Sequence, residues 1–330
     1  MPPFEYVRAG DAAAAVALVS ADPQAQYLAG GTTQIDLMLK DGVIAPGRLV
    51  DITRLPLRGV TARDETLLVG ALTTMEELAA DPTIAERIPF VREALLAGAS
   101  PQLRNMATIG GNILQRTRCR YFRDADVTAC NKRAPGSGCA AVRGPARMHA
   151  ILGASEHCIA LHPSDLCVPL VALDTVVDIQ AADGSRSVPL TQFFVLPGGR
   201  PEIENVLEHG ELITWMRIPL LPIGTRSGYL KVRDRASYEF ALTSAAAALL
   251  IEDGTIVRAR LALGGVGTMP WRALEAEEML HGAPATTRTF RAAAKAALGD
   301  PFTVPGTAFK VELAKRTIVR ILQTVSEAPC

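Results

Sequence analysis

Tyr27-Leu28-Ala29-Gly30-Gly31-Thr32-Thr33-Gln34 is a stretch in which a glycine doublet and two threonines follow an apolar lead. It predicts a short strand over residues 27–29, a tight turn over residues 30–33 and a helix over residues 34–40, with Ile35, Met38 and Leu39 on one face. Glycines let backbone N–H groups approach a phosphate closely, and a helix N-terminus and threonine hydroxyls add favourable interactions. The stretch indicates an anion site, although a glycine doublet alone is also typical of a plain turn.

A second doublet follows another apolar lead at Thr108-Ile109-Gly110-Gly111-Asn112. Because a dinucleotide has two phosphates, two such turns favour a dinucleotide ligand more than either turn does alone. Neither fits the G-x-G-x-x-G fingerprint of the Rossmann fold, and the sequence has no P-loop, G-x-S-x-G or H-E-x-x-H motif. Hydrolase and kinase activities therefore lack their usual sequence support.

Four of the six cysteines lie within a 40-residue window, as Cys119, Cys130, Cys139 and Cys158. Their successive separations of 11, 9 and 19 residues contain no C-x-x-C pair, which argues against a zinc finger or ribbon. An iron–sulfur cluster accommodates wider spacing, because its cysteines need only converge from different turns of an irregular loop. Spacing alone leaves three interpretations open: an iron–sulfur cluster, a zinc site, or buried inert thiols with occasional disulfides.

The segment around these cysteines is strongly basic. Residues 116–147 contain eight Lys or Arg and two Asp, whereas the whole chain has 34 basic and 34 acidic residues. Cations beside cysteines stabilise thiolates, and a cluster held by four thiolates carries negative charge. The basic segment is also compatible with a solvated loop or a docking surface.

Composition excludes several classes of protein. With 330 residues, 48% hydrophobic and 21% charged, the chain is long enough for about two domains and does not have the composition of a disordered protein. Its zero net charge gives no global field to attract nucleic acid, and no apolar run is long enough to span a membrane. Residues 12–21 are predicted to form a helix capped by Asp11, so we expect no signal peptide on this chain.

The order of predicted elements indicates an α+β fold. Short strands and helices alternate through residues 1–180, and a helix start at His162-Pro163-Ser164-Asp165-Leu166 places Asp165 where it could bind a ligand hydroxyl. Asp183-Gly184 and Asp253-Gly254 predict hairpins, and three helices are expected after the second hairpin. We expect two α+β domains with a boundary between about residues 180 and 215.

These motifs resemble a known superfamily. In order and spacing, the two glycine stretches and His162-Pro163-Ser164-Asp165 resemble the flavin-binding subunits of the xanthine dehydrogenase and molybdenum hydroxylase superfamily. The resemblance covers essentially the whole chain. The cysteine segment, with Gly111–Cys119, Cys130–Arg133 and Pro135–Cys139, is more specific: it is similar to the flavin subunit of bacterial three-subunit aldehyde oxidoreductases of the periplasmic type, whose loop carries an additional iron–sulfur cluster.

The resemblance implies a particular α+β architecture. A two-subdomain FAD-binding domain of the PCMH type would span residues 1–200, with subdomains of about 1–60 and 61–200 and an iron–sulfur loop at 116–158. A C-terminal α+β domain like that of the carbon monoxide dehydrogenase flavoprotein would span residues 215–330.

The resemblance also implies the ligands of two cofactors. FAD would be bound by Tyr27, Leu28, Ala29, Gly30, Gly31, Thr32, Thr33, Gln34, Ile35, Thr108, Gly110, Gly111, Asn112, Asp165, Leu166 and Lys231. A [4Fe-4S] cluster would be bound by Cys119, Cys130, Cys139 and Cys158.

The activity implied is electron transfer, with no substrate-converting residue in this chain. Electrons from a molybdenum-cofactor subunit would cross a small [2Fe-2S] subunit to the FAD and then reach an external acceptor. The complex would be periplasmic by co-export with a partner, or cytoplasmic. Three alternatives remain open: the flavin subunit of an aromatic acyl-CoA reductase or another molybdenum hydroxylase, a stand-alone flavoprotein oxidase, and a structural iron–sulfur scaffold.

Overall fold

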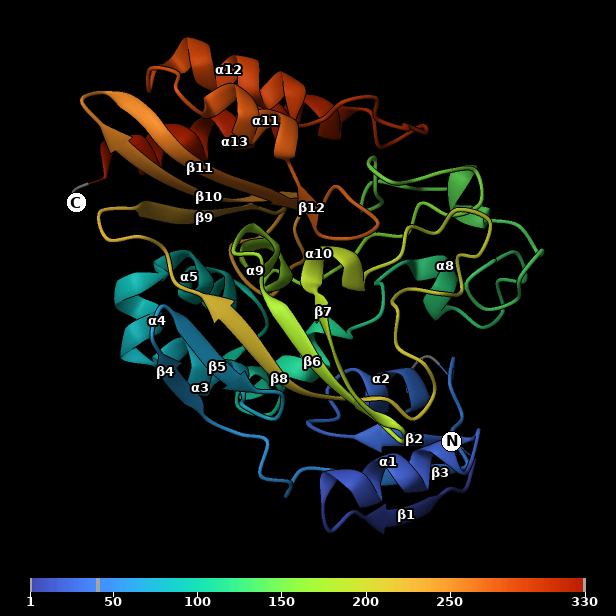
Figure 1. The fold of residues 1–330 in the computed structure, drawn as a ribbon. Helices are drawn as coiled ribbons and strands as arrows, with labels where there is room; N and C mark the ends of the chain where they lie inside the picture. The colour runs from blue at the N-terminus through green and yellow to red at the C-terminus, as the bar shows by residue number, and fades with distance from the viewer. Residues whose placement is uncertain (1, 40–41, 329–330) are drawn as a thin grey trace.

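Three sheets form the framework of the molecule (Figure 1). The computed structural model describes residues 2–39 and 42–328. A small N-terminal sheet lies at one end, a five-stranded sheet lies in the middle, and a four-stranded sheet with the C-terminal helices lies at the other end. The cysteine segment runs along one side of the molecule as largely irregular chain. The mixture of strands and helices confirms the predicted α+β class.

The N-terminal sheet is parallel, with strand order β1-β3-β2. Its elements are β1 (Glu5–Arg8), α1 (Ala12–Ser20), β2 (Ala25–Leu28), α2 (Gln34–Leu39) and β3 (Arg48–Asp51). The predicted cap of α1 is confirmed, because the Asp11 carboxylate accepts a hydrogen bond from the Ala14 amide at 2.7 Å. Such a cap satisfies an amide that the first helical turn leaves without a partner.

The buried face of α2 differs from the prediction. Leu37 and Met38 are buried, whereas Ile35 and Leu39 are 42% and 60% exposed. A helix of six residues makes fewer than two turns, so its apolar spacing does not determine which side faces the core. Lys40, predicted as the last residue of this helix, lies outside the described residues.

The central sheet has the strand order β4-β5-β8-β6-β7 and is antiparallel throughout. Its strands are β4 (Val60–Arg63), β5 (Thr66–Gly70), β6 (Val176–Ala181), β7 (Gly184–Pro189) and β8 (Leu212–Pro219). The helices of this region are α3 (Met75–Ala80), α4 (Pro82–Arg87), α5 (Pro89–Ala97), α6 (Pro101–Arg104), α7 (Ile109–Ile113), α8 (Arg120–Arg123), α9 (Cys167–Ala172) and α10 (Leu190–Phe193), with a short 3-10 turn at Ala140–Val142. The hairpin predicted at Asp183-Gly184 joins β6 to β7.

Strand β8 bears on the domain boundary. It spans residue 215, where the second domain was predicted to begin, yet it pairs with β5 and β6 inside the central sheet. We therefore propose a first domain that includes β8, and a second domain that begins near β9. Residue spacing gave no sign of this pairing, because the partners of β8 lie far away in the sequence.

The C-terminal sheet has the order β12-β11-β10-β9. Its elements are β9 (Arg226–Val232), β10 (Thr243–Glu252), β11 (Thr255–Gly264), β12 (Trp271–Arg272), α11 (Leu274–Leu280), α12 (Thr287–Ala296) and α13 (Phe309–Glu327). Strand β10 is buried on both faces: Ala246 and Ala248 join the core of the first domain, whereas Ala245, Ala247 and Leu249 join the core under the C-terminal helices. Because side chains alternate along a strand, β10 packs against both domains at once.

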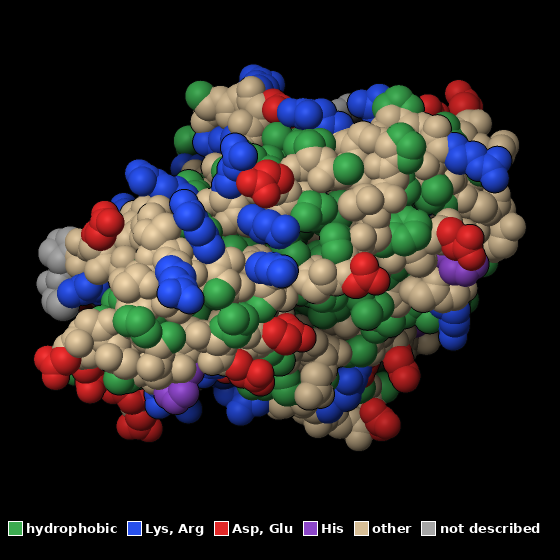
Figure 2. Space-filling view, turned by 90° about the horizontal axis from the view of Figure 1, so that it is seen from above, with side chains coloured by type: hydrophobic (Ala, Val, Ile, Leu, Met, Phe, Trp, Pro, Cys, Tyr) green, Lys and Arg blue, Asp and Glu red, His purple; other side chains and the backbone are tan. Residues whose placement is uncertain are grey.

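The outer surface of the C-terminal region is mixed in charge. Seen from above, it exposes Lys and Arg side chains together with Asp, Glu and scattered apolar side chains (Figure 2). No field of a single sign covers the face in this view.

Candidate functional site

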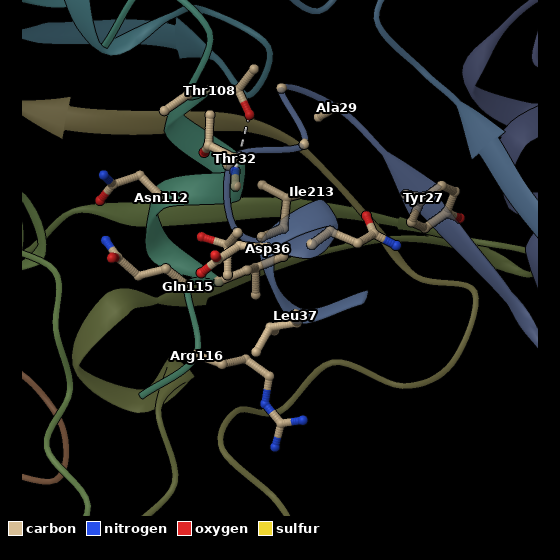
Figure 3. A pocket seen from close by; sticks show the side chains of 18 of the residues that line it. Tyr27, Ala29, Thr32, Asp36, Leu37, Thr108, Asn112, Gln115, Arg116 and Ile213 are labelled. Carbon is tan, nitrogen blue, oxygen red and sulfur yellow. Dashed lines mark hydrogen bonds between the residues drawn. The ribbon is translucent and has the colours of Figure 1, made fainter. Parts of the chain in front are cut away.

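A large cavity of about 840 Å³ lies where the N-terminal sheet, the central sheet and β9 meet. All the predicted flavin-site residues line it except Leu28 and Ile35. Leu28 is the last residue of β2, and the exposed Ile35 side chain lies against Gly31. Figure 3 shows Thr32, Thr108, Asn112 and Gln115 around this cavity. The fold thus brings together two glycine turns that are about 80 residues apart in sequence.

The first glycine turn presents free backbone donors. Within the described residues, the amides of Gly31, Thr32 and Thr33 donate no hydrogen bond to another part of the chain. Gly31 has φ +70°, a conformation that glycine adopts readily. Gly30 is needed for a different reason, because a Cβ there would lie 1.9 Å from the Met106 carbonyl oxygen. This turn can therefore hold an anion through its amides.

The second glycine turn is built into the fold more tightly. The Gly110 amide donates to the Ala71 carbonyl at 2.8 Å, and the Gly111 amide donates to Thr108 Oγ1 at 3.3 Å (Figure 3). The Asn112 side chain accepts a 2.6 Å hydrogen bond from Ser164. The two doublets thus differ: the first leaves amides open to the cavity, and the second uses its amides to close the turn that forms the cavity wall.

Asp165 and Lys231 form a buried ion pair at the cavity edge. Lys231 Nζ lies 2.7 Å from Asp165 Oδ2, and their side chains are 5% and 10% exposed. Tyr229 donates to Asp165 Oδ1 at 2.6 Å, and burial with this nearby carboxylate raises the pKa of Tyr229 well above its usual value. Both oxygens of Asp165 are therefore bound by β9, which fixes the C-terminal sheet against the cavity.

Sequence reasoning missed one wall of the cavity. Tyr238, Glu239 and Phe240, in the connection between β9 and β10, line it, and the Arg118 guanidinium lies 5.0 Å from the centre of the Phe240 ring. Tyr27 also donates a 2.5 Å hydrogen bond to the carbonyl of Gly210 from the segment before β8. These contacts join segments that no local pattern connects.

The four clustered cysteines converge. Cys119, Cys130, Cys139 and Cys158 line one small cavity, and each is a free thiol. Cys167, which was not assigned to the cluster, is buried in α9 away from that cavity. Cys330 lies outside the described residues.

Asn131 ties three of the cysteine-bearing segments together. Its Oδ1 accepts a 2.8 Å hydrogen bond from the amide of Gly138, the neighbour of Cys139. Its Nδ2 donates a 2.9 Å hydrogen bond to the carbonyl of His157, the neighbour of Cys158. Because Asn131 itself follows Cys130, one side chain sets the relative positions of three thiols.

The cysteine cavity does not have the geometry of a single metal ion. In the described part of the chain, no group of three or more His, Cys, Asp or Glu side chains could hold one. Burial, with Cys130 and Cys158 nearby, raises the pKa of Cys119 to about 12, and burial also raises the pKa of Cys158. Burial therefore favours the protonated form of the Cys119 and Cys158 thiols, and binding of a metal by these thiols would release protons.

Most of the basic residues in the cysteine segment form ion pairs within the chain. Five of them do so, as Arg116–Glu204 at 2.7 Å, Lys132–Glu204 at 2.9 Å, Arg118–Asp36 at 3.2 Å, Arg123–Asp36 at 2.8 Å and Arg147–Asp234 at 2.7 Å. Asp36 belongs to α2, so the two ion pairs that it forms, with Arg118 and Arg123, connect the cysteine segment to the helix after the first glycine turn.

A small cavity separates the large cavity from the cysteines. It shares Leu114, Gln115 and Pro163 with the large cavity, and it shares Lys132 and Cys158 with the cysteine cavity. The two candidate sites are therefore neighbours rather than independent features of the molecule.

Two family models together match almost the whole chain. The FAD binding domain in molybdopterin dehydrogenase matches residues 2–221, and the CO dehydrogenase flavoprotein C-terminal domain matches residues 228–325. The chain belongs to the FAD-binding subunits of the molybdenum hydroxylases. The two models confirm the predicted resemblance to this superfamily and the predicted order of an FAD-binding domain followed by a C-terminal α+β domain.

Several proteins of the family are similar to this chain over most of its length. The aldehyde oxidoreductase FAD-binding subunit PaoB of Escherichia coli (strain K12) is 45% identical over 325 residues, 98% of each chain. The glyceraldehyde dehydrogenase medium chain of Sulfolobus acidocaldarius is 30% identical over 85% of this chain and 82% of that one. A solved carbon monoxide dehydrogenase from Hydrogenophaga pseudoflava superposes with a TM-score of 0.76 at 26% identity, covering 98% of each chain.

The chain is thus an FAD-binding subunit of an oxidoreductase of the molybdenum hydroxylase type. Its relatives are named as subunits or medium chains, so the family works in enzymes with several subunits. Over residues 2–39 and 42–328, no helix combines the length and apolar character that crossing a membrane requires.

Proposed function

We propose that this chain is the electron-transfer subunit of a molybdenum-dependent aldehyde oxidoreductase and carries both FAD and a [4Fe-4S] cluster. Electrons would arrive from a large molybdenum-cofactor subunit through a small [2Fe-2S] subunit and leave for an external acceptor. The observation that carries the proposal is the convergence of four cysteines on one cavity beside the large cavity that the glycine turns form.

The large cavity fits FAD. The free amides of Gly31, Thr32 and Thr33 would hold the pyrophosphate, with Thr108 and Asn112 forming the opposite wall. Lys231 is the basic side chain nearest to Asp165 and would face the rest of the cofactor from β9. Bound FAD supplies the redox chemistry, while the protein contributes binding, orientation and electrostatics.

The cysteine cavity fits a cluster better than a single ion. Four thiols line it, which is the ligand number of a [4Fe-4S] cluster. The Lys132 ammonium lies close enough to Cys158 to favour its thiolate, which opposes the effect of burial on the pKa of Cys158.

In this proposal the partner subunits carry out the chemistry on the substrate. The large subunit would oxidise the aldehyde, and the small subunit would connect it to this one. If a partner carries a twin-arginine signal, the folded complex would be exported and would work in the periplasm; otherwise it would be cytoplasmic. Fractionation of cells that express all the subunits distinguishes the two.

The test is a cofactor count on the complex purified with its co-expressed partners. Iron and released flavin are measured per complex, and visible spectra are recorded before and after dithionite. Cys119→Ser and Cys130→Ser should remove the iron of this subunit and leave the flavin in place, because the thiolate ligands are lost while the large cavity is intact. Cys167→Ser is the matched control, since Cys167 lies away from the cysteine cavity.

Three results would contradict the proposal. Flavin without iron attributable to this subunit would leave an FAD subunit with structural cysteines. Wild-type iron content in both serine variants would likewise indicate an FAD subunit with structural cysteines. Absence of flavin would remove the basis of the electron-transfer function altogether.

A further inference from the structure

Cys119 has a polar neighbour that is not a cysteine. Nε2 of His149 lies 3.2 Å from Cys119 Sγ, and the His149 side chain is buried at 4% exposure. Its other ring nitrogen, Nδ1, has no hydrogen-bond partner among the described residues. The Tyr121 ring lies beside the imidazole, with centroids 6.0 Å apart. A buried histidine normally satisfies its nitrogens, so this ring is oriented mainly by the cysteine sulfur and by packing.

A buried lysine holds the backbone of His149. Lys310, in the first turn of α13, is fully buried, and its Nζ donates a 2.7 Å hydrogen bond to the His149 carbonyl. No carboxylate among residues 2–39 and 42–328 pairs with it. A buried ammonium without a counter-charge is costly, and burial beside the Arg147 cation lowers the pKa of Lys310 to about 7.

The proposed cluster would supply the counter-charge that Lys310 lacks. Four thiolates around a [4Fe-4S] core would give the site a negative charge, and Cys119, one of the four cysteines, lies beside His149. Hydrogen bonds to cluster sulfurs and nearby positive charges stabilise the reduced form, which carries one more negative charge. His149 and Lys310 would therefore raise the reduction potential of the cluster.

We propose that His149 donates a hydrogen bond from Nε2 to the Sγ of Cys119, and that Lys310 holds His149 in place and adds a buried positive charge, so that together they raise the reduction potential of the cluster. The inference rests on the proposed [4Fe-4S] site and concerns residues outside its four ligands. His149 and Lys310 are positioning residues: neither would bind iron. Because Lys310 belongs to the C-terminal domain, that domain would help to set the potential of a cluster in the cysteine segment of the first domain.

The test measures the potential of the cluster rather than turnover. Variants His149→Phe and Lys310→Met are purified as the complete complex, and iron content and the reduction midpoint of the cluster are measured by EPR-monitored titration. His149→Phe keeps a ring against Tyr121 but removes the donor, and Lys310→Met keeps the chain length but removes the charge. Each should keep wild-type iron and shift the reduction equilibrium about tenfold toward the oxidised form, which is about 59 mV for one electron.

Arg143→Met is the matched control. Arg143 is an exposed cation of the same segment, so its loss removes an equal charge without touching Cys119 or His149. A shift in this variant as large as that in Lys310→Met would assign the effect to general charge and overturn the inference. Full iron with an unchanged midpoint in His149→Phe and Lys310→Met would overturn it as well.

Loss of iron in a variant is resolved by conservative replacements. His149→Gln keeps a side-chain N–H, and Lys310→Arg keeps the charge. Recovery of both iron and midpoint in these variants supports the inference, whereas iron loss equal to that of the Phe and Met variants overturns it in favour of packing. Wild-type complex without this cluster would instead contradict the proposed function, so the two failures are distinguishable.

Discussion

At the scale of single residues, position 30 requires glycine because the Met106 backbone lies very close to it. A Cβ at this position would lie 1.9 Å from the Met106 carbonyl oxygen, and that carbonyl belongs to the chain that leads into the second glycine turn. The flexibility of glycine is therefore secondary here, because the space itself is absent. The close approach of Gly30 to Met106 also brings the two walls of the large cavity together.

Gly30→Ala should therefore destabilise the protein and weaken its hold on flavin. We expect a loss of about 1–3 kcal/mol in the free energy of unfolding, the usual cost of overpacking, together with less FAD retained after gel filtration. Thermal unfolding and released flavin measure the two effects. Gly10→Ala is the control, because nothing lies within 4 Å of a Cβ there. Equal behaviour of the two variants would contradict the packing argument.

Asn131 determines the positions of the cysteines through two hydrogen bonds. Asn131→Ala removes both bonds and leaves the Gly138 amide and the His157 carbonyl without their partner. Each lost hydrogen bond costs about 0.5–1.5 kcal/mol, so we expect lower stability and severalfold lower iron content. Iron per chain after desalting is the measurement. Asn105→Ala removes an exposed side chain that donates to the Pro101 carbonyl, and this variant should keep wild-type iron. An iron loss there would mean that the assay reports general instability.

At the scale of elements, Glu204 joins the segment before β8 to the cysteine segment. Burial favours the neutral acid, but the cations Arg116 and Lys132 outweigh burial and hold the pKa of Glu204 below its usual value. A carboxyl with a lowered folded pKa stabilises the protein above its unfolded pKa, and this stabilisation is lost as the pH falls through the folded pKa. The ionised pair therefore contributes at neutral pH and disappears in acid.

Glu204→Gln should remove that part of the acid sensitivity. Between pH 6 and pH 3 the unfolding free energy of the wild type should fall more steeply than that of the variant, because only the wild type binds a proton at this position on unfolding. Chemical denaturation at a series of pH values gives the slope of the unfolding free energy against pH for the wild type and for the variant. Glu202→Gln, two residues away and paired with the exposed Arg200, is the control and should keep the wild-type slope. Parallel curves for wild type and Glu204→Gln would contradict the prediction.

Elements with local signals were predicted well, and those that depend on distant partners were not. The Asp11 cap and the hairpins at Asp183 and Asp253 follow from neighbouring residues, so their sequence patterns were sufficient. The membership of β8 in the central sheet depends on pairing with β5 and β6, which no local pattern encodes. The burial of α2 was misjudged for a related reason: its neighbours decide which face is covered.

The candidate sites show the same division. Glycine doublets and clustered cysteines are short motifs with a direct chemical meaning, so the glycine turns of the large cavity and the four cysteines of the small one could be proposed from the sequence. Asn131, His149 and Lys310 carry no such motif, because each acts through a segment that folding brings beside it. These three residues can be identified only from the folded structure.

At the scale of the whole molecule, the two domains share a core. Ala246 and Ala248 of β10 pack into the core of the first domain, while the next side chains along the strand pack under the C-terminal helices. The Asp165–Lys231 ion pair and the hydrogen bond from the Tyr229 amide to Glu93, 2.6 Å long, also cross between the domains. Removing either domain would expose apolar surface and leave buried charges unpaired, so each depends on the other.

We therefore expect the domains to unfold as one cooperative unit. The chain has two tryptophans, Trp215 in β8 and Trp271 in β12, so each domain carries one fluorescent reporter. In Trp215→Phe and Trp271→Phe, the remaining tryptophan follows one domain, and far-UV circular dichroism follows the whole chain. A shared core predicts coincident denaturant midpoints for the two probes within each variant, since two-state unfolding leaves no intermediate with one domain folded. A tryptophan transition separated from the circular dichroism transition in either variant would mean that β10 does not couple the domains, and that the C-terminal domain could detach while the flavin cavity remains formed.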